Sequence, residues 1–233
     1  MQKKDITVVV VTVALVIACA ATPGFLDTFI AVTSAYPYVM SFIKFAILAT
    51  FGECIGLRIT SGLYSRPGFG ILPKAIVWGI LGLGIKAAFT IFATGVPAVL
   101  AEVGVPVSAT TMKTGPFMWK AVTAFCIATA INYCFGTVFM TLHRITDMHI
   151  AFTGGTVGGL LQPIPMSRYL GEINWNALWG FVFKKTIPVF WIPAHTVTFL
   201  LPQHFQVVFA AFLGVVLGVI LAVAAKQKSL QPA

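Results

Sequence analysis

The stretch FMWKAVTAFCIATAINYCFGTVFMTLHRITD, residues 117–147, decides how this chain folds. It begins as a long apolar run, and about 20 apolar residues suffice to cross a bilayer as a helix. Asn132 lies near its middle, where an amide without a hydrogen-bond partner is costly. The stretch therefore predicts a membrane-spanning helix with one polar face, around which the other helices pack.

Composition extends this prediction to the whole chain of 233 residues. Hydrophobic residues make up 58% of it and charged residues 9%, whereas soluble domains carry about 25% charged residues. We predict an all-α, polytopic membrane protein in which residues 1–233 form one helical domain. No length remains for a separate catalytic domain, so we expect no enzyme activity.

The formal net charge of +9 has a simple explanation in a membrane protein. Lys and Arg collect in cytoplasmic loops and fix the orientation of the chain. No basic run exceeds two residues, which argues against nucleic-acid binding. The lipid bilayer is the expected partner.

Six apolar segments are long enough to cross the membrane. We predict spans at residues 6–21, 37–59, 72–100, 117–142, 177–201 and 205–225. The first resembles a secretory signal, but we prefer to interpret it as an uncleaved span. The four arginines, Arg58, Arg66, Arg144 and Arg168, then fall on the side of both termini. By the positive-inside rule, both termini then face the cytoplasm. We expect the protein in a bacterial inner membrane.

Ionisable side chains inside spans usually face a cavity or a partner. Depth estimates at about 1.5 Å per residue place Lys44, Lys86 and His195 at one level, where they could form a cationic ring. Glu53 falls at the depth of Lys184 and Lys185 and could pair with either. Together these positions predict a polar cavity lined by Lys44, Glu53, Lys86, Asn132 and His195. In the alternative interpretation, the side chains of Lys44 and Lys86 extend along the helix and place their ammonium groups at the membrane–water interface.

Other polar residues have structural interpretations. Arg144 and Asp147 are three residues apart and could form an ion pair on one helix face. The four histidines do not cluster along the chain, and no CxxC spacing is present. We therefore expect no metal site and no cofactor.

Small residues recur at every fourth position of the last span: Ala210, Gly214, Gly218 and Ala222. Such a ridge is typical of close packing between helices, either within one bundle or between subunits of a homo-oligomer.

Three stretches resemble the Mpv/PMP family of small peroxisomal and mitochondrial inner-membrane proteins, including its bacterial branch. The first carries Phe135-Gly136, His143-Arg144 and Thr146-Asp147; the second is 186–195 with Phe199 and Pro202; the third is Ile43-Lys44-Phe45 with Glu53 and Trp78. The family's Gly-Pro is Gly136-Thr137 here, its Trp-Tyr is Leu142-His143, and its last arginine is Gln206. The resemblance implies a channel-like or solute-handling role.

Two functions from different classes follow. The first is a channel-like or transport protein whose cationic cavity takes small, anionic solutes. The second is a membrane packing or assembly protein without transport activity, which acts through contacts between helices.

Overall fold

The computed structural model describes residues 2–229, and every regular element in this range is helical. In chain order the elements are α1 (Lys3–Ala21), α2 (Phe25–Ala35), α3 (Pro37–Ser61), α4 (Ile71–Glu102), α5 (Thr111–Thr114), α6 (Phe117–Ile131), the π-helical η1 (Asn132–Gly136), α7 (Thr137–Phe152), α8 (Val157–Leu160), α9 (Met166–Glu172), α10 (Trp175–Ala177), the π-helical η2 (Leu178–Trp191), α11 (Ile192–Leu200) and α12 (Gln203–Ser229). The predicted all-α class is confirmed.

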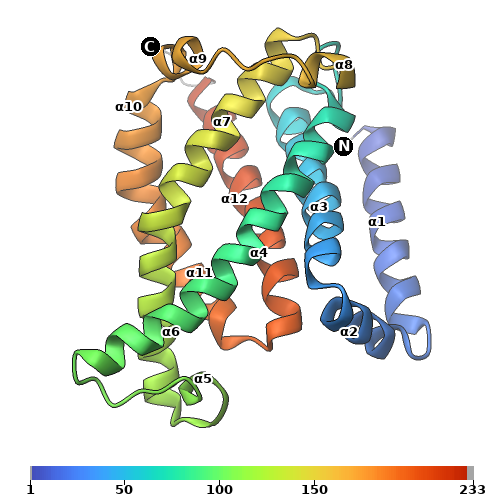
Figure 1. Cartoon of the computed structure of the whole chain (residues 1–233). Coiled ribbons are helices and arrows are strands. Elements are labelled where there is room, and N and C mark those ends of the chain that lie inside the picture. The colour runs from blue at the N-terminus through green and yellow to red at the C-terminus, as the bar shows by residue number, and fades with distance from the viewer. Residues whose placement is uncertain (1, 230–233) are drawn as a thin grey trace.

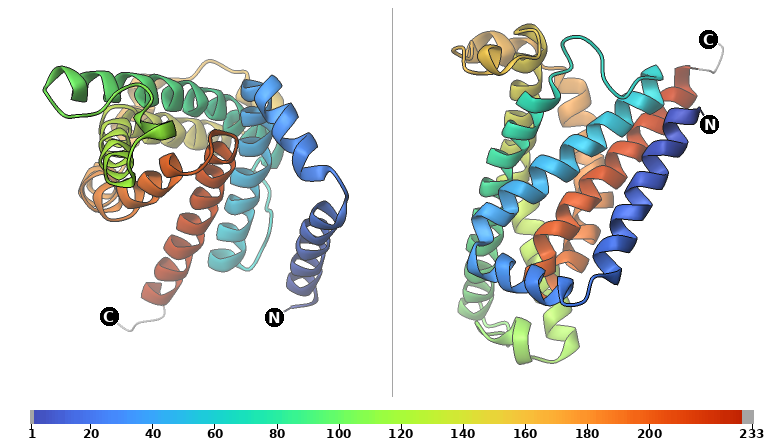
Figure 2. Two further views of the ribbon diagram at one scale, coloured as in Figure 1. Left: turned by 90° about the horizontal axis from the view of Figure 1, so that it is seen from below. Right: turned by 90° about the vertical axis from the view of Figure 1, so that its right-hand side faces the viewer.

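The long elements run up and down between two ends of one bundle (Figure 1). α1 begins and α12 ends at the same end, together with the short helices α8 and α9; we call this the termini end (Figure 2). The short helices α2 and α5 lie at the opposite end. The chain therefore returns repeatedly through the same thickness, as a polytopic membrane protein must.

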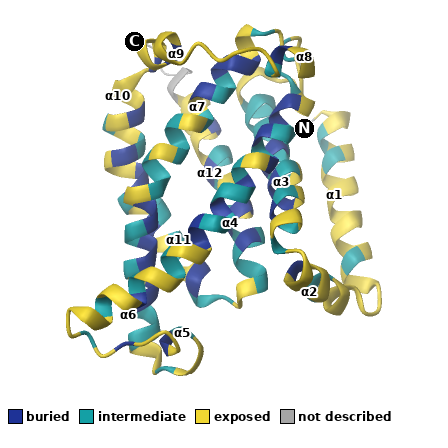
Figure 3. Cartoon of the chain, viewed as in Figure 1, coloured by how far each residue is buried: buried dark blue, intermediate teal, exposed yellow. Residues whose placement is uncertain are grey.

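Five helices are long and apolar enough to cross a membrane: Lys3–Ala21, Pro37–Ser61, Ile71–Glu102, Phe117–Phe152 and Gln203–Gln227. Many of their large apolar side chains are exposed (Figure 3), which suits a lipid solvent rather than water. The stretch predicted as 117–142 continues as helix to Phe152. The predicted span 177–201 is helical too, but it is built from three successive elements, α10, η2 and α11.

The π-helical segment η2 is the most irregular part of the bundle. Pro188 lies inside it and Pro193 stands at the first turn of α11. A proline lacks the N–H that an α-helix needs and its ring crowds the preceding turn, and a wider π turn accommodates both effects. The sequence predicted a kinked helix here, and the structure resolves the irregularity as π-helical turns.

Small residues let the central helices approach closely. Ala124, Ile127 and Ala128 of α6 are fully buried. Where α3 meets α4, the hydroxyl of Ser41 donates a buried hydrogen bond of 2.7 Å to the carbonyl oxygen of Gly82. A Cβ atom at Gly82 would lie 2.8 Å from the Cβ of Phe45 and 2.9 Å from the Ser41 carbonyl oxygen. Glycine is therefore required at position 82 for this helix contact.

Gly82→Ala should destabilise the fold by about 1–3 kcal/mol, because the added methyl group overpacks the α3–α4 contact. The matched control is Gly84→Ala on the same helix, where the nearest atom to a new Cβ is 3.8 Å away. Thermal unfolding of both variants in detergent would measure the difference. Equal midpoints for the two variants would contradict the prediction.

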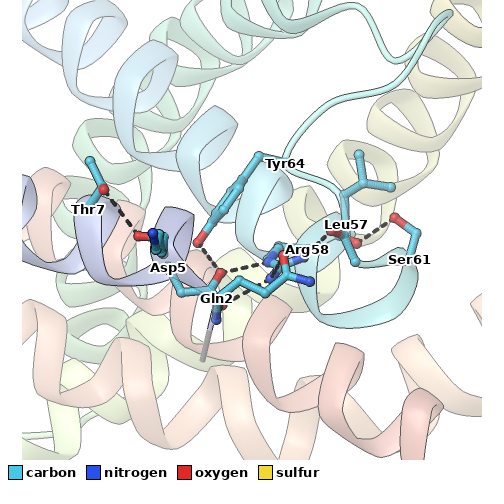
Figure 4. Close-up of polar contacts among 9 residues, drawn as sticks. Gln2, Asp5, Thr7, Leu57, Arg58, Ser61 and Tyr64 are labelled. Atoms are coloured by element: carbon cyan, nitrogen blue, oxygen red, sulfur yellow. Dashed lines mark hydrogen bonds and ion pairs between the residues drawn. The ribbon is translucent and has the colours of Figure 1, made fainter.

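A polar clasp attaches α1 to the rest of the bundle (Figure 4). None of the residues of α1 is buried, and this helix stands at the edge of the bundle (Figures 1 and 2). At the termini end Arg58 Nε and Nη2 donate to the two carboxylate oxygens of Asp5, at 2.7 and 3.0 Å. The Tyr64 hydroxyl also donates to Asp5, at 3.0 Å. Desolvation and this hydrogen bond raise the pKa of Tyr64.

Asp5→Asn should loosen the first turns of α1, because the bidentate, charge-assisted pair with Arg58 is lost. Hydrogen–deuterium exchange of residues 2–10 should become faster than in the parent protein. Asp27→Asn, on α2, is the control, since Asp27 forms no ion pair within residues 2–229. Unchanged exchange in Asp5→Asn would show that the Asp5–Arg58 pair does not hold the first turns of α1.

Candidate functional site

A cavity of about 1310 Å³ lies between the helices of the bundle, lined by residues of α3, α4, α6, η1, α7, η2, α11 and α12. Arg66, Pro67 and Glu172 line it at the termini end. Along α4 the wall runs from Lys74 to Phe89, a rise of about 22 Å. The cavity therefore reaches from the loops of the termini end deep into the bundle.

Charged groups from three helices meet in its wall. The ammonium group of Lys74 (α4) contacts the carboxylates of Glu53 (α3) and Asp147 (α7). The indole N–H of Trp78 donates to the second oxygen of Glu53, at 2.5 Å. Lys74 is only 9% exposed at its side chain. We call Glu53, Lys74 and Asp147 the ionic triad; it fixes the relative positions of α3, α4 and α7.

The triad corrects two predicted ion pairs. Glu53 pairs with Lys74 rather than with Lys184 or Lys185, whose side chains are exposed on η2. Asp147 pairs with Lys74 rather than with Arg144. Depth estimates gave the height of each residue but not its direction around the helix axis, and the π turns of η2 change that direction further.

His143 lies beside the triad without a hydrogen bond. Its Nε2 is 3.9 Å from Asp147 Oδ2, which is too long for a hydrogen bond. Its Nδ1 is buried and has no partner. The imidazole packs against the indole ring of Trp78, with 4.3 Å between ring centroids. A polar ring left unsatisfied in this way is unusual in a folded protein.

At the inner end of the cavity, Asn132 and His195 form a second polar pair. The Asn132 amide nitrogen donates to the Ala128 carbonyl oxygen at 2.7 Å and lies 2.9 Å from His195 Nδ1. Because an amide nitrogen can only donate, Nδ1 accepts and the proton of neutral His195 resides on Nε2. Phe89 and Trp191 pack on the His195 ring.

Three of the residues predicted to line a cavity, Glu53, Asn132 and His195, line this one. The predicted cationic ring does not form, because the two lysines turn elsewhere. Lys44 is buried and donates to Thr33 Oγ1 of α2, at 3.0 Å. Lys86 donates to Thr90 Oγ1 one turn further along α4, at 3.0 Å.

Both ammonium groups of these lysines reach toward the opposite end of the bundle. This geometry agrees with the alternative interpretation, in which a lysine stem runs through apolar surroundings toward the interface. Lys44 also lies over the Phe29 ring, 4.4 Å from its centroid, so α2 shields it.

The small ridge of α12 lies along the cavity. Ala210, Gly214, Gly218 and Ala222 all line the cavity. A Cβ added at Gly214 or Gly218 would meet no atom within 4 Å. The close α3–α12 contact uses Gly52 instead, where a Cβ would lie 3.1 Å from Val215 Cγ2. The predicted packing role of the ridge thus fits Ala210 and Ala222, which are buried, whereas Gly214 and Gly218 leave the cavity open.

Glu53, His143 and Asp147 bring atoms of metal-ligand type within 4.8 Å of one another. The ammonium of Lys74 already contacts both carboxylates, so a cationic side chain occupies the place between them that a metal ion would take. We therefore assign no metal site to this cluster.

Sequence reasoning missed the roles of Lys74, Trp78 and His143. Lys74 lies near the start of its span, where a lysine normally reaches water, so no signal in the sequence marked it. The His143–Asp147 spacing of four residues was a usable signal for a shared helix face.

Comparison of the chain with protein-family models, with curated proteins and with solved structures gave no match. The resemblance to the Mpv/PMP family stays a prediction.

Lys74→Met should destabilise the protein by about 3–5 kcal/mol, because two carboxylates then face each other without their cation. The control Arg168→Met breaks an exposed ion pair with Glu172 and should change stability far less. Chemical unfolding in detergent would compare the two variants. If Lys74→Met unfolds no earlier than Arg168→Met, the triad does not stabilise the bundle.

Proposed function

We propose that this chain is a channel-like or transport protein of a membrane, and that its internal cavity takes small, anionic solutes. The observation that carries the proposal is the cavity of about 1310 Å³, with charged and polar side chains in its wall, inside a bundle whose outer surface is apolar. Ionisable groups within membrane helices are costly and typically line solute or ion pathways.

The proposed topology has six spans, with α10, η2 and α11 together as the fifth. All four arginines belong to elements at the termini end: Arg58 ends α3, Arg66 follows it, Arg144 lies on α7 and Arg168 on α9. By the positive-inside rule this end faces the cytoplasm, and the cavity then opens toward the cytoplasm. We propose a bacterial inner membrane as its location.

Two guanidinium groups support an anionic solute. Arg66 and Arg144 both line the cavity and are exposed within it or at its mouth. Neither forms an ion pair within residues 2–229. Guanidinium groups bind carboxylates and phosphates through paired hydrogen bonds. The unpaired arginines thus take over the role that the sequence assigned to Lys44 and Lys86.

The alternative function was assembly through the small ridge of α12. The ridge residues line the cavity, which favours a role in the solute space over a role in subunit contact. The transport proposal accounts for the same four residues, because small side chains keep the solute space open.

The test is flux through proteoliposomes that contain the purified protein. Chloride, inorganic phosphate and succinate are the anion probes, and K⁺ is the cation probe. We expect anion flux above that of empty vesicles and little K⁺ flux. Flux equal to empty vesicles for all the anions would overturn the proposal.

Gly214→Leu should lower anion flux severalfold without unfolding the protein, because Gly214 lines the cavity and a Cβ added there has no atom within 4 Å. Gly95→Leu on α4 is the matched control: it also has no neighbour within 4 Å and does not line the cavity. If Gly214→Leu keeps full flux, or instead changes the oligomeric state, the ridge belongs to an interface.

A further inference from the structure

The ionic triad carries unequal charge. It contains two carboxylates, Glu53 and Asp147, and one ammonium group, Lys74. With His143 neutral, the cluster therefore has a formal charge of −1. Uncompensated charge is costly where apolar side chains replace water. The cluster is thus one positive charge short of neutrality.

His143 is placed to supply that charge. Asp147 uses Oδ1 for Lys74, and its Oδ2 lies 3.9 Å from His143 Nε2. A small rotation would close this distance to a hydrogen bond. A protonated imidazole carries N–H on both nitrogens, so its Nε2–H could donate to Oδ2 while Lys74 keeps Oδ1.

No other side chain takes this role in the surroundings of His143. From α4 it faces Lys74 and Trp78, from α3 Glu53, and on its own helix Asp147 and the exposed Arg144. A smaller cavity of about 220 Å³ adjoins it on the side of η2 and α12. From η2 and α12 its lining is uncharged: Leu178, Val182, Thr186, Leu217 and Leu221. Arg144 lines this cavity as well, but it forms no ion pair with Asp147.

We propose that His143 is a proton-binding site of the cavity, and that its proton accompanies an anionic solute. The second part rests on the proposed transport function. A cluster of charge −1 in the wall repels an anion, and this repulsion is strong where the effective dielectric constant is low. Protonation of His143 from the water at the termini end makes the cluster neutral and removes the repulsion. Imidazole can change charge between pH 5 and 8.

Trp78 provides a direct readout, because a protonated imidazole quenches the fluorescence of an indole in contact with it. Trp191 also contacts a histidine, His195, so the measurement uses the Trp191→Phe background. In the purified full-length protein, fluorescence should fall on acidification from pH 8 to 5. The fall should be absent in the added variant His143→Gln and present in the control His204→Gln, which lies at the opposite end.

The variant Asp147→Asn tests whether the carboxylate of Asp147 stabilises the protonated form of His143. An opposite charge favours the charged form of a neighbouring group, so the acid-induced fall in Trp78 fluorescence should be smaller in Asp147→Asn. The nitrogen resonances of ¹⁵N-histidine-labelled protein, assigned with His143→Gln, would report protonation of His143 without fluorescence. Absence of a protonated His143 at pH 5, or the same response in Asp147→Asn as in the parent, would overturn the proton site.

Flux measurements separate this inference from the proposed function. An inward proton gradient should accelerate succinate uptake into proteoliposomes in the parent and in His204→Gln, but not in His143→Gln. If the proton gradient does not change succinate uptake by the parent protein, proton coupling is overturned and the transport function stands. A normal titration of His143 with no anion flux at any pH would overturn the transport function and leave the proton site.

Discussion

The contact of the Lys74 ammonium with two carboxylates is the constraint on which this bundle depends. Its members come from α3, α4 and α7, three helices that cannot be positioned by hydrophobicity in a membrane, since lipid is as apolar as their side chains. The Lys74 side chain is only 9% exposed, so loss of one partner of this ion pair is expensive. The triad also lines the cavity, so the same contact holds three helices together and forms part of the proposed site.

The cavity exists because the helices around it do not pack tightly along their whole length. The small residues of α12 leave space where larger ones would close it. Residues of both π-helical segments, η1 and η2, line this space, and η1 begins with Asn132, at the inner end of the cavity. π-helical turns recur at functional sites because they redirect side chains that a regular helix would hide. In contrast, the α4–α6 side of the bundle is closed by Ala124, Ile127 and Ala128.

The lysines within the long helices α3 and α4 are accommodated in two different ways. Lys44 and Lys86 each satisfy their ammonium group on a threonine hydroxyl and reach toward the interface. Lys74 instead enters a network with acidic partners. Only the second arrangement creates a charged site in the cavity wall, and its imbalance of one negative charge links the structure to the proton site proposed for His143. The depth of a charge in the bilayer therefore says less about function than the groups that it meets.

The sequence by itself determined the fold class of this protein and the approximate positions of its long apolar helices. Apolar runs of span length and the scarcity of charge predicted an all-helical membrane protein, because backbone groups in lipid must be satisfied within helices. It also singled out Glu53, Asn132 and His195, since polar side chains at such depths need a partner. Only the tertiary structure decided which partners they have. Helical periodicity fixes the faces within one helix, whereas the rotation of one helix against another depends on contacts between residues far apart in the chain. That rotation brought Lys74 to Glu53 and Asp147, turned Lys44 away toward α2, and directed Gly214 into a cavity instead of a helix interface.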